Sequence, residues 1–217
     1  KGWPMVDIEW AMSELGQVYH SEDHFKLGLA AELAKMYGDE RVRLEWTPAT
    51  NAQVDIGIRR GDVTIPVELK YKTKKGTVED DAFDETFVLT SDGAHTKVHY
   101  RLFRDVRRVE EIVAEQGRYG YFVLLTNDSN YWSPGHSTDA LYDDFRVHEG
   151  RTVEGTLEWR EVKDWIRNNG MADPIELSGR YRMEWSSYEY RDDISVSDNP
   201  EFRLLVVRVD ATDSPDE

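Results

Sequence analysis

Residues 54–71 read VDIGIRRGDVTIPVELKY, and this stretch predicts a β-hairpin. Two runs with the alternation typical of strands flank Gly61-Asp62, a two-residue turn signal. A loop of those two residues gives a pairing register in which Asp55 faces Glu68. Like charges directly opposite one another destabilise a strand pair, so we expect a positive group between the two carboxylates.

The residues around Glu68 also indicate a chemistry. Lys70 follows Glu68 by two positions and therefore lies on the same face of its strand. The carboxylates of Asp55 and Glu68 and the carbonyl of Leu69 are oxygen ligands suited to Mg²⁺ or Mn²⁺. An ammonium beside such an ion can orient an attacking water while charge on a phosphodiester is stabilised. We expect these groups to face solvent or metal, and to hydrolyse a nucleic-acid backbone.

Asp55, twelve intervening residues and the triplet Glu68-Leu69-Lys70 resemble the site of the PD-(D/E)xK nuclease superfamily. Val54 stands where the family name has Pro. A looser resemblance to a group of uncharacterised restriction-endonuclease-like proteins covers three further segments. They are Ser21-Glu22-Asp23-His24-Phe25, the run ELKYKTK at 68–74, and LTND at 125–128 with Tyr131-Trp132.

The resemblance implies an α/β, restriction-endonuclease-like fold, with a central mixed β-sheet flanked by helices. It implies divalent-metal-dependent hydrolysis of DNA phosphodiester bonds, with Mg²⁺ or Mn²⁺ as cofactor. It further implies an additional acid on the helix that precedes the hairpin. Glu22 is our choice for that acid and Glu32 is the competing one. Alternatively, Glu22 only stabilises the start of its helix through the helix dipole.

Basic side chains near the predicted site are candidates for binding DNA phosphates. Lys72, Lys74 and Lys75 follow the second strand of the hairpin, and Arg104 and Arg108 are one turn apart on a predicted helix. Other interpretations stay open for each group. Lysines after an edge strand often face solvent or prevent edge pairing, and the arginines can form surface ion pairs of little energetic value.

The remaining pattern predicts a mixed α/β protein. Ser21 is a good N-cap for an apolar-striped helix that ends near Gly38. A second amphipathic helix is expected over 97–116, a buried strand over 119–125, a short helix over 159–168, and closing strands over 181–190 and 202–209. Residues 76–96 read as irregular apart from a short strand at 86–89. We interpret His95 and His99 as surface histidines.

Composition limits the class of protein. The chain has 217 residues, no Cys and a formal net charge of −16. We expect one domain over 1–209 with a disordered acidic tail over 210–217, and no membrane span or signal peptide. The absence of Cys favours a cytoplasmic location. Scarce Lys and abundant Asp and Glu resemble the composition of a salt-loving organism's protein.

Two other functions remain open at this stage. The chain is alternatively a non-catalytic DNA-binding or protein-interaction module on the same fold, or a structural domain in which Lys70 neutralises Asp55 and Glu68. The sequence does not decide between DNA and RNA, or between duplex and branched substrates. It also leaves a homodimer open, which would allow both strands of a duplex to be cut.

Overall fold

The computed structural model describes residues 5–48, 52–91, 93, 95–116, 118–135 and 139–211. Within these residues the main sheet has six strands and is mixed, because β3 pairs parallel to β6 while the other neighbours are antiparallel. In spatial order the strands are β1 (Val42–Trp46), β2 (Val54–Arg60), β3 (Val63–Lys72), β6 (Tyr119–Thr126), β11 (Phe202–Asp210) and β9 (Trp185–Tyr188).

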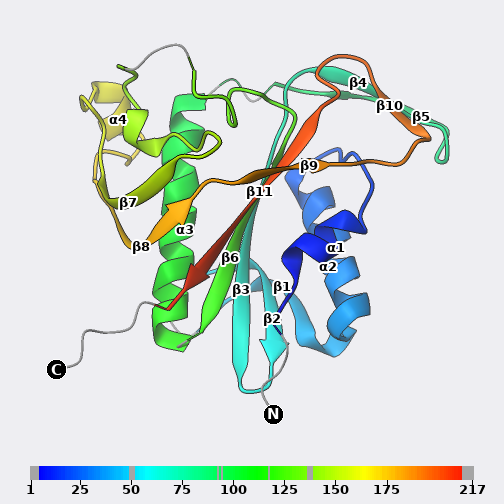
Figure 1. The fold of residues 1–217 in the computed structure, drawn as a ribbon, viewed down its shortest axis with the longest axis horizontal. Coiled ribbons are helices and arrows are strands. Elements are labelled where there is room, and N and C mark those ends of the chain that lie inside the picture. Colours follow the sequence, from blue (N-terminus) through cyan, green and yellow to red (C-terminus); the bar gives the residue numbers. More distant parts are fainter. Residues whose placement is uncertain are drawn as a thin grey trace.

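Helices cover both faces of this sheet, as Figure 1 shows. The helices α1 (Ile8–Ser13) and α2 (Glu22–Tyr37) lie on one side, and the long helix α3 (His95–Gln116) lies on the other. Each side has its own hydrophobic core. The predicted mixed α/β class, with a central mixed sheet flanked by helices, is therefore confirmed.

The hairpin forms in the predicted register. Ile56 pairs with Val67 and Ile58 pairs with Ile65, and all four side chains are buried against the core on the side of α1 and α2. Alternation along β3 then places Glu68 and Lys70 on the opposite face from Leu69. That opposite face is the one on which α3 packs.

Helix α2 begins and ends where the sequence predicts. The Ser21 side chain accepts a hydrogen bond from the backbone N–H of His24, and Glu22 and Asp23 add negative charge to the first turn. This arrangement satisfies an otherwise unpaired N–H and complements the helix dipole. Gly38, with a φ of 101°, ends the helix in a conformation that L side chains rarely adopt.

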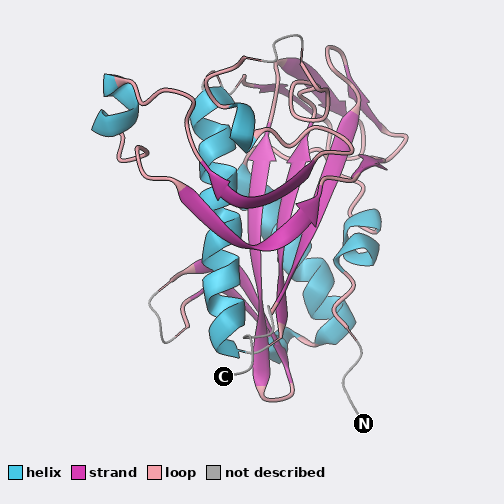
Figure 2. Cartoon of the chain, turned by 60° about the vertical axis from the view of Figure 1, so that its left-hand side comes forward, coloured by secondary structure: helices cyan, strands magenta, loops and turns pink. Residues whose placement is uncertain are grey.

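Two smaller sheets are attached to the main one, and the sequence predicts only part of them (Figure 2). The segment 76–96 was expected to be largely irregular, but its first residues form a strand. A three-stranded sheet comprises β10 (Ile194–Val196), β4 (Gly76–Asp80) and β5 (Glu85–Leu89). A two-stranded sheet comprises β7 (Thr152–Leu157) and β8 (Ile175–Arg182), with α4 (Asp164–Asn168) between them in sequence.

Three other expectations need correction. The strand expected over 181–190 is two strands, β8 and β9, because the chain leaves one sheet and joins another. His99 is buried rather than exposed, and burial lowers its pKa to about 3. Strand β11 continues through Asp210, one residue into the predicted tail, and the rest of that tail from residue 212 lies outside the described residues.

No helix among the described residues is both long enough and apolar enough to cross a bilayer.

Candidate functional site

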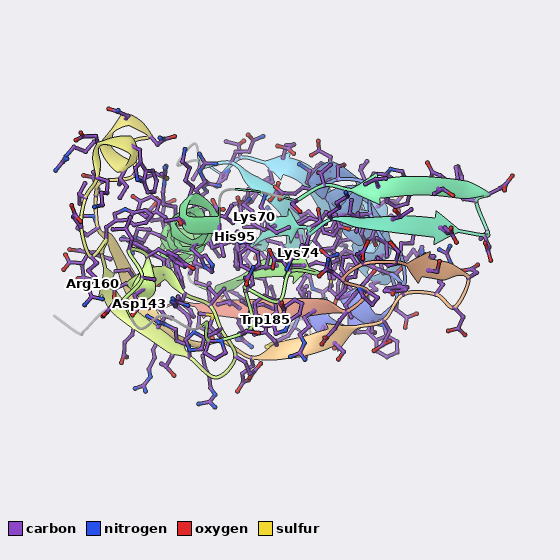
Figure 3. All side chains as sticks on the ribbon, turned by 90° about the horizontal axis from the view of Figure 1, so that it is seen from above. Lys70, Lys74, His95, Asp143, Arg160 and Trp185 are labelled. Atoms are coloured by element: carbon purple, nitrogen blue, oxygen red, sulfur yellow. The ribbon has the colours of Figure 1, made fainter. Side chains whose placement is uncertain are left out.

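A cleft of about 390 Å³ opens between β3, the start of α2 and one side of α3. Figure 3 shows Lys70 next to α3, seen along the helix from above. Acidic and basic side chains from three elements meet in this cleft. Its lining residues are Glu22, Glu68, Lys70, Lys72, Val98, Arg101, Arg104, Asp105 and Arg108.

Lys70 occupies the centre of the acidic group. Its Nζ lies 3.3 Å from Asp105 Oδ2, 3.5 Å from Glu22 Oε1 and 3.8 Å from Glu68 Oε1. It also donates a 2.9 Å hydrogen bond to the Leu69 carbonyl. Burial opposes the charge of the ammonium, but the surrounding carboxylates outweigh that effect and raise its pKa above the ordinary value for lysine. The positive charge expected between Asp55 and Glu68 is thus supplied by two lysines, because Lys70 lies beside Glu68 while Asp55 pairs with Lys26 of α2.

Glu68 is the most buried carboxylate of the site. Its side chain is 5% exposed, and Oε1 accepts a 2.7 Å hydrogen bond from Arg108. The other oxygen, Oε2, is buried and has no hydrogen-bond partner among the residues that the structure describes. Burial raises the pKa of Glu68 to about 8, with Asp105 and Asp55 adding to the rise against Lys70 and Arg108. Glu68 was expected to face solvent or metal. The expectation that it faces solvent is wrong, because its side chain is buried.

Asp55 is held from two sides. Its Oδ2 accepts a 2.9 Å hydrogen bond from the Leu69 N–H, and its Oδ1 lies 3.3 Å from Lys26 Nζ. Lys26, on α2, also contacts Glu45 and Asp23, and these partners raise its pKa although burial opposes them. Lys26 was not predicted from the sequence. A helix-borne lysine facing the strand that carries Asp55 gives no local sequence signal.

Glu22, at the start of α2, takes the place expected for an additional acid. Its Oε2 accepts a 3.0 Å hydrogen bond from the backbone N–H of Tyr71, and its Oε1 faces Lys70. Glu32 instead pairs with Lys35 and does not line the cleft. Of the two candidates, Glu22 is therefore the one beside Glu68 and Lys70.

Asp105 is an acid of the site that was not predicted from the sequence. It comes from α3, its side chain is 8% exposed, and it lies 3.3 Å from both Lys70 and Arg108. Burial raises its pKa, while Lys70 and Arg108 oppose the rise. A signal did exist in the sequence, because Asp105 falls on the apolar stripe of the helix, between Leu102 and Val109. A charge on that stripe indicates a buried partner.

Of the five basic residues predicted to bind nucleic acid, three line the cleft and two do not. Arg108 lies inside the site, bonded to Glu68 and Asp105, while Arg104 is exposed at the mouth. Lys72 lines the cleft within 4.0 Å of Glu22. Lys74 lies 4.0 Å from Asp128, and Lys75 is exposed beside Ser91, so neither belongs to the lining of the cleft.

The predicted metal ligands can be compared with this geometry. Glu68 fits a cation, because one of its buried oxygens has no partner among the described residues and a cation would favour the ionised form that burial disfavours. The other two ligand groups are engaged, Asp55 by Lys26 and the Leu69 carbonyl by Lys70. Over the described ranges, no group of three or more His, Asp or Glu side chains is arranged to hold a metal ion. Ammonium and guanidinium groups separate the carboxylates instead.

Comparisons with known proteins found none that is similar to this chain. No family model, no curated protein and no solved structure matches the chain.

The raised pKa of Glu68 predicts how stability depends on pH. The folded protein keeps the Glu68 proton up to about pH 8, whereas an unfolded chain releases it near 4.5, the ordinary pKa of a glutamic acid side chain. The folded state therefore binds more protons between these values, and this residue makes stability fall as pH rises from about 4.5 to about 8. Urea unfolding of Glu68→Gln should lack that part of the pH dependence. Equal pH slopes for the variant and the native chain would contradict the assignment.

Proposed function

We propose that this protein is a divalent-metal-dependent nuclease that hydrolyses DNA phosphodiester bonds, on a restriction-endonuclease-like form of its mixed α/β fold. One observation carries the proposal. Carboxylates from β3, α2 and α3 surround Lys70, and Asp55 of β2 accepts a hydrogen bond from the N–H of the adjacent Leu69. Among the described residues, one buried oxygen of Glu68 has no hydrogen-bond partner. Buried carboxylates with perturbed pKa values in a cleft are typical of functional sites.

In the proposed reaction, each side chain has a role that its position supports. Asp55 and Glu68 would hold the ion through their carboxylates, Leu69 would add its carbonyl oxygen, and Glu22 would be an additional acid beside the ion. A bound Mg²⁺ or Mn²⁺ supplies Lewis-acid stabilisation of charge on the phosphodiester and lowers the pKa of water. Lys70, held in place by the carboxylates, orients the attacking water at the floor of the cleft and neutralises developing negative charge.

Occupation by the ion requires that protein cations move. Lys70 must move away from the Leu69 carbonyl, and Lys26 must move away from Asp55. A metal ion and an ammonium repel each other when both lie against the same oxygen atoms. Both lysines have flexible side chains and further carboxylate partners, Asp105 or Glu22 for Lys70 and Glu45 or Asp23 for Lys26. The ion and the lysines can therefore be redistributed without leaving an unpaired buried ammonium.

A second candidate function also has an observation in its favour. In the structure Lys26, Lys70 and Arg108 already neutralise much of the acidic group. A site balanced in this way suits a DNA-binding or protein-interaction module that does not use a metal. The two functions differ in whether the carboxylates bind Mn²⁺ and whether DNA is cut.

The test combines a metal titration with a cleavage assay. Mn²⁺ and Mg²⁺ are titrated calorimetrically into the native chain, Asp55→Ala and Glu68→Ala, and supercoiled plasmid and single-stranded DNA are incubated with each protein with and without EDTA. The native chain should bind the ion and cut DNA, and both variants should lose both properties. Glu45→Ala is the matched control, because it removes another Lys26 partner but no predicted ligand. Cleavage that survives in Asp55→Ala would refute the proposal.

A further inference from the structure

Two arginines at the mouth of the cleft differ from the other charged groups around it. Arg101 and Arg104 both line the cleft from α3, and both are exposed. None of the ion pairs found among the described residues involves either of them. Their neighbours Arg107 and Arg108, by contrast, are bound to Glu110 and Glu111 and to Glu68 and Asp105, respectively.

The spacing of these arginines places like charges next to each other on the surface of α3. Residues three or four positions apart are neighbours on a helix surface, so Arg104 lies between Arg101 and Arg108 along one ridge. Like charges at this spacing destabilise a helix. The chain has an excess of acidic residues, with a net charge of −16, yet no ion pair of the described residues joins one of them to Arg101 or Arg104. An anionic partner from outside the chain would relieve the repulsion.

The charges of the cleft are also separated by depth. The carboxylates of Glu68 and Asp105 are buried at its floor, whereas Arg101 and Arg104 are exposed at its rim on α3. Lys72, from β3, lines the same cleft beside Glu22. A polyanion that crosses the mouth thus meets positive charge on α3 and on β3 before it meets the buried acids.

We propose that Arg101 and Arg104 form a phosphate-binding rim that seats one strand of DNA across the mouth of the cleft. The strand runs between α3 and Lys72, with one phosphodiester above Lys70 and the adjacent phosphates on the two guanidiniums. Guanidinium groups suit this task because they bind phosphate oxygens through two parallel hydrogen bonds. The inference rests on the proposed function for its choice of DNA, and it adds the residues that would hold the substrate.

The test measures DNA binding in EDTA, where metal-dependent cleavage does not occur. Fluorescein-labelled single-stranded and duplex DNA of mixed sequence are titrated with the native chain and with R101Q/R104Q over a range of NaCl concentrations. The variant should bind about tenfold more weakly at low salt, as expected for lost charge-assisted hydrogen bonds. The slope of log K against log salt should fall by about 2, one unit for each phosphate contact.

R180Q/R182Q is the matched control. Arg180 and Arg182 are exposed arginines on β8 that pair with Glu154 and Glu184, away from the lining of the cleft. This variant makes the same change in net charge and should keep the salt slope of the native chain. An equal loss in both variants would assign the effect to net charge and overturn the rim.

The outcomes separate the rim from the nuclease. A native chain that cuts DNA and an R101Q/R104Q variant with an unchanged salt slope would overturn the rim and leave the nuclease standing. A native chain that binds DNA through the two arginines but never cuts it would support the rim and refute the nuclease. A native chain that neither binds nor cuts DNA would overturn both.

Discussion

Lys70→Met should lower the proposed DNA cleavage by about two to three orders of magnitude and also destabilise the fold. Loss of a group that stabilises developing charge typically costs about 10²–10³-fold in rate. The Lys70 side chain is 18% exposed and is close to three carboxylates, so its removal leaves uncompensated negative charge in a buried place. We expect the free energy of unfolding to fall by about 3–5 kcal/mol, the range found when one partner of a buried ion pair is removed.

The pH dependence of that loss identifies its cause. Without Lys70, nearby carboxylates such as Glu68 and Asp105 hold their protons to higher pH, because the cation that favours their ionised forms is gone. The destabilisation should therefore be larger at pH 8 than at pH 5, as measured by urea unfolding. Lys72→Met is the control, since Lys72 is on the same strand face and lies 4.0 Å from Glu22, without contacting the buried Glu68 or Asp105 in any ion pair of the described residues. A destabilisation independent of pH would contradict the electrostatic explanation.

Glu110→Ala should have the other large effect, on the attachment of β8 to α3. Glu110 is 3% exposed at its side chain and accepts hydrogen bonds from the N–H groups of Ser178 and Gly179 and from the Tyr181 hydroxyl. Truncation leaves the buried Tyr181 hydroxyl and two partly buried N–H groups without their acceptor, and an unsatisfied buried group costs about 1–3 kcal/mol. We expect a loss of at least about 3 kcal/mol in unfolding free energy.

Hydrogen exchange locates the effect of Glu110→Ala within the molecule. Amide protection should fall first in β7 and β8, while β2 and β3 of the main sheet keep theirs. Glu111→Ala is the neighbouring control, because that side chain is 54% exposed and its loss should change stability by less than about 0.5 kcal/mol. Uniform loss of protection in Glu110→Ala would show that β8 is not a separately attached unit.

The hairpin and the start of α2 were predictable because their signals are local. A two-residue turn fixes the register of β2 and β3, and alternation then fixes which face carries Glu68 and Lys70. The start of α2 follows from Ser21 and the acids after it, which also places Glu22 near the strand end. For these residues, short-range rules and the final fold agree.

The other members of the site depend on contacts that are distant in sequence. Lys26 reaches Asp55 from α2, and Arg108 and Asp105 reach Glu68 and Lys70 from α3. No short-range rule pairs these residues. The two small sheets were hard to predict for a similar reason, since their short strands pair with partners far along the chain, as β10 does with β4. Burial strengthens the interactions between the charged residues of the site. Which residues are buried depends on the assembled fold and not on the local sequence.

The parallel pairing of β3 with β6 has a consequence for the order of folding. Parallel strands require a crossover, and here the crossover contains α3, the helix that carries Asp105 and Arg108. The hairpin closes a short loop and can form quickly, but α3 docks only when a much longer loop closes. During synthesis, Asp55 and Glu68 are therefore paired across the hairpin before α3 reaches them. The cleft forms later, in one of the slower steps of folding.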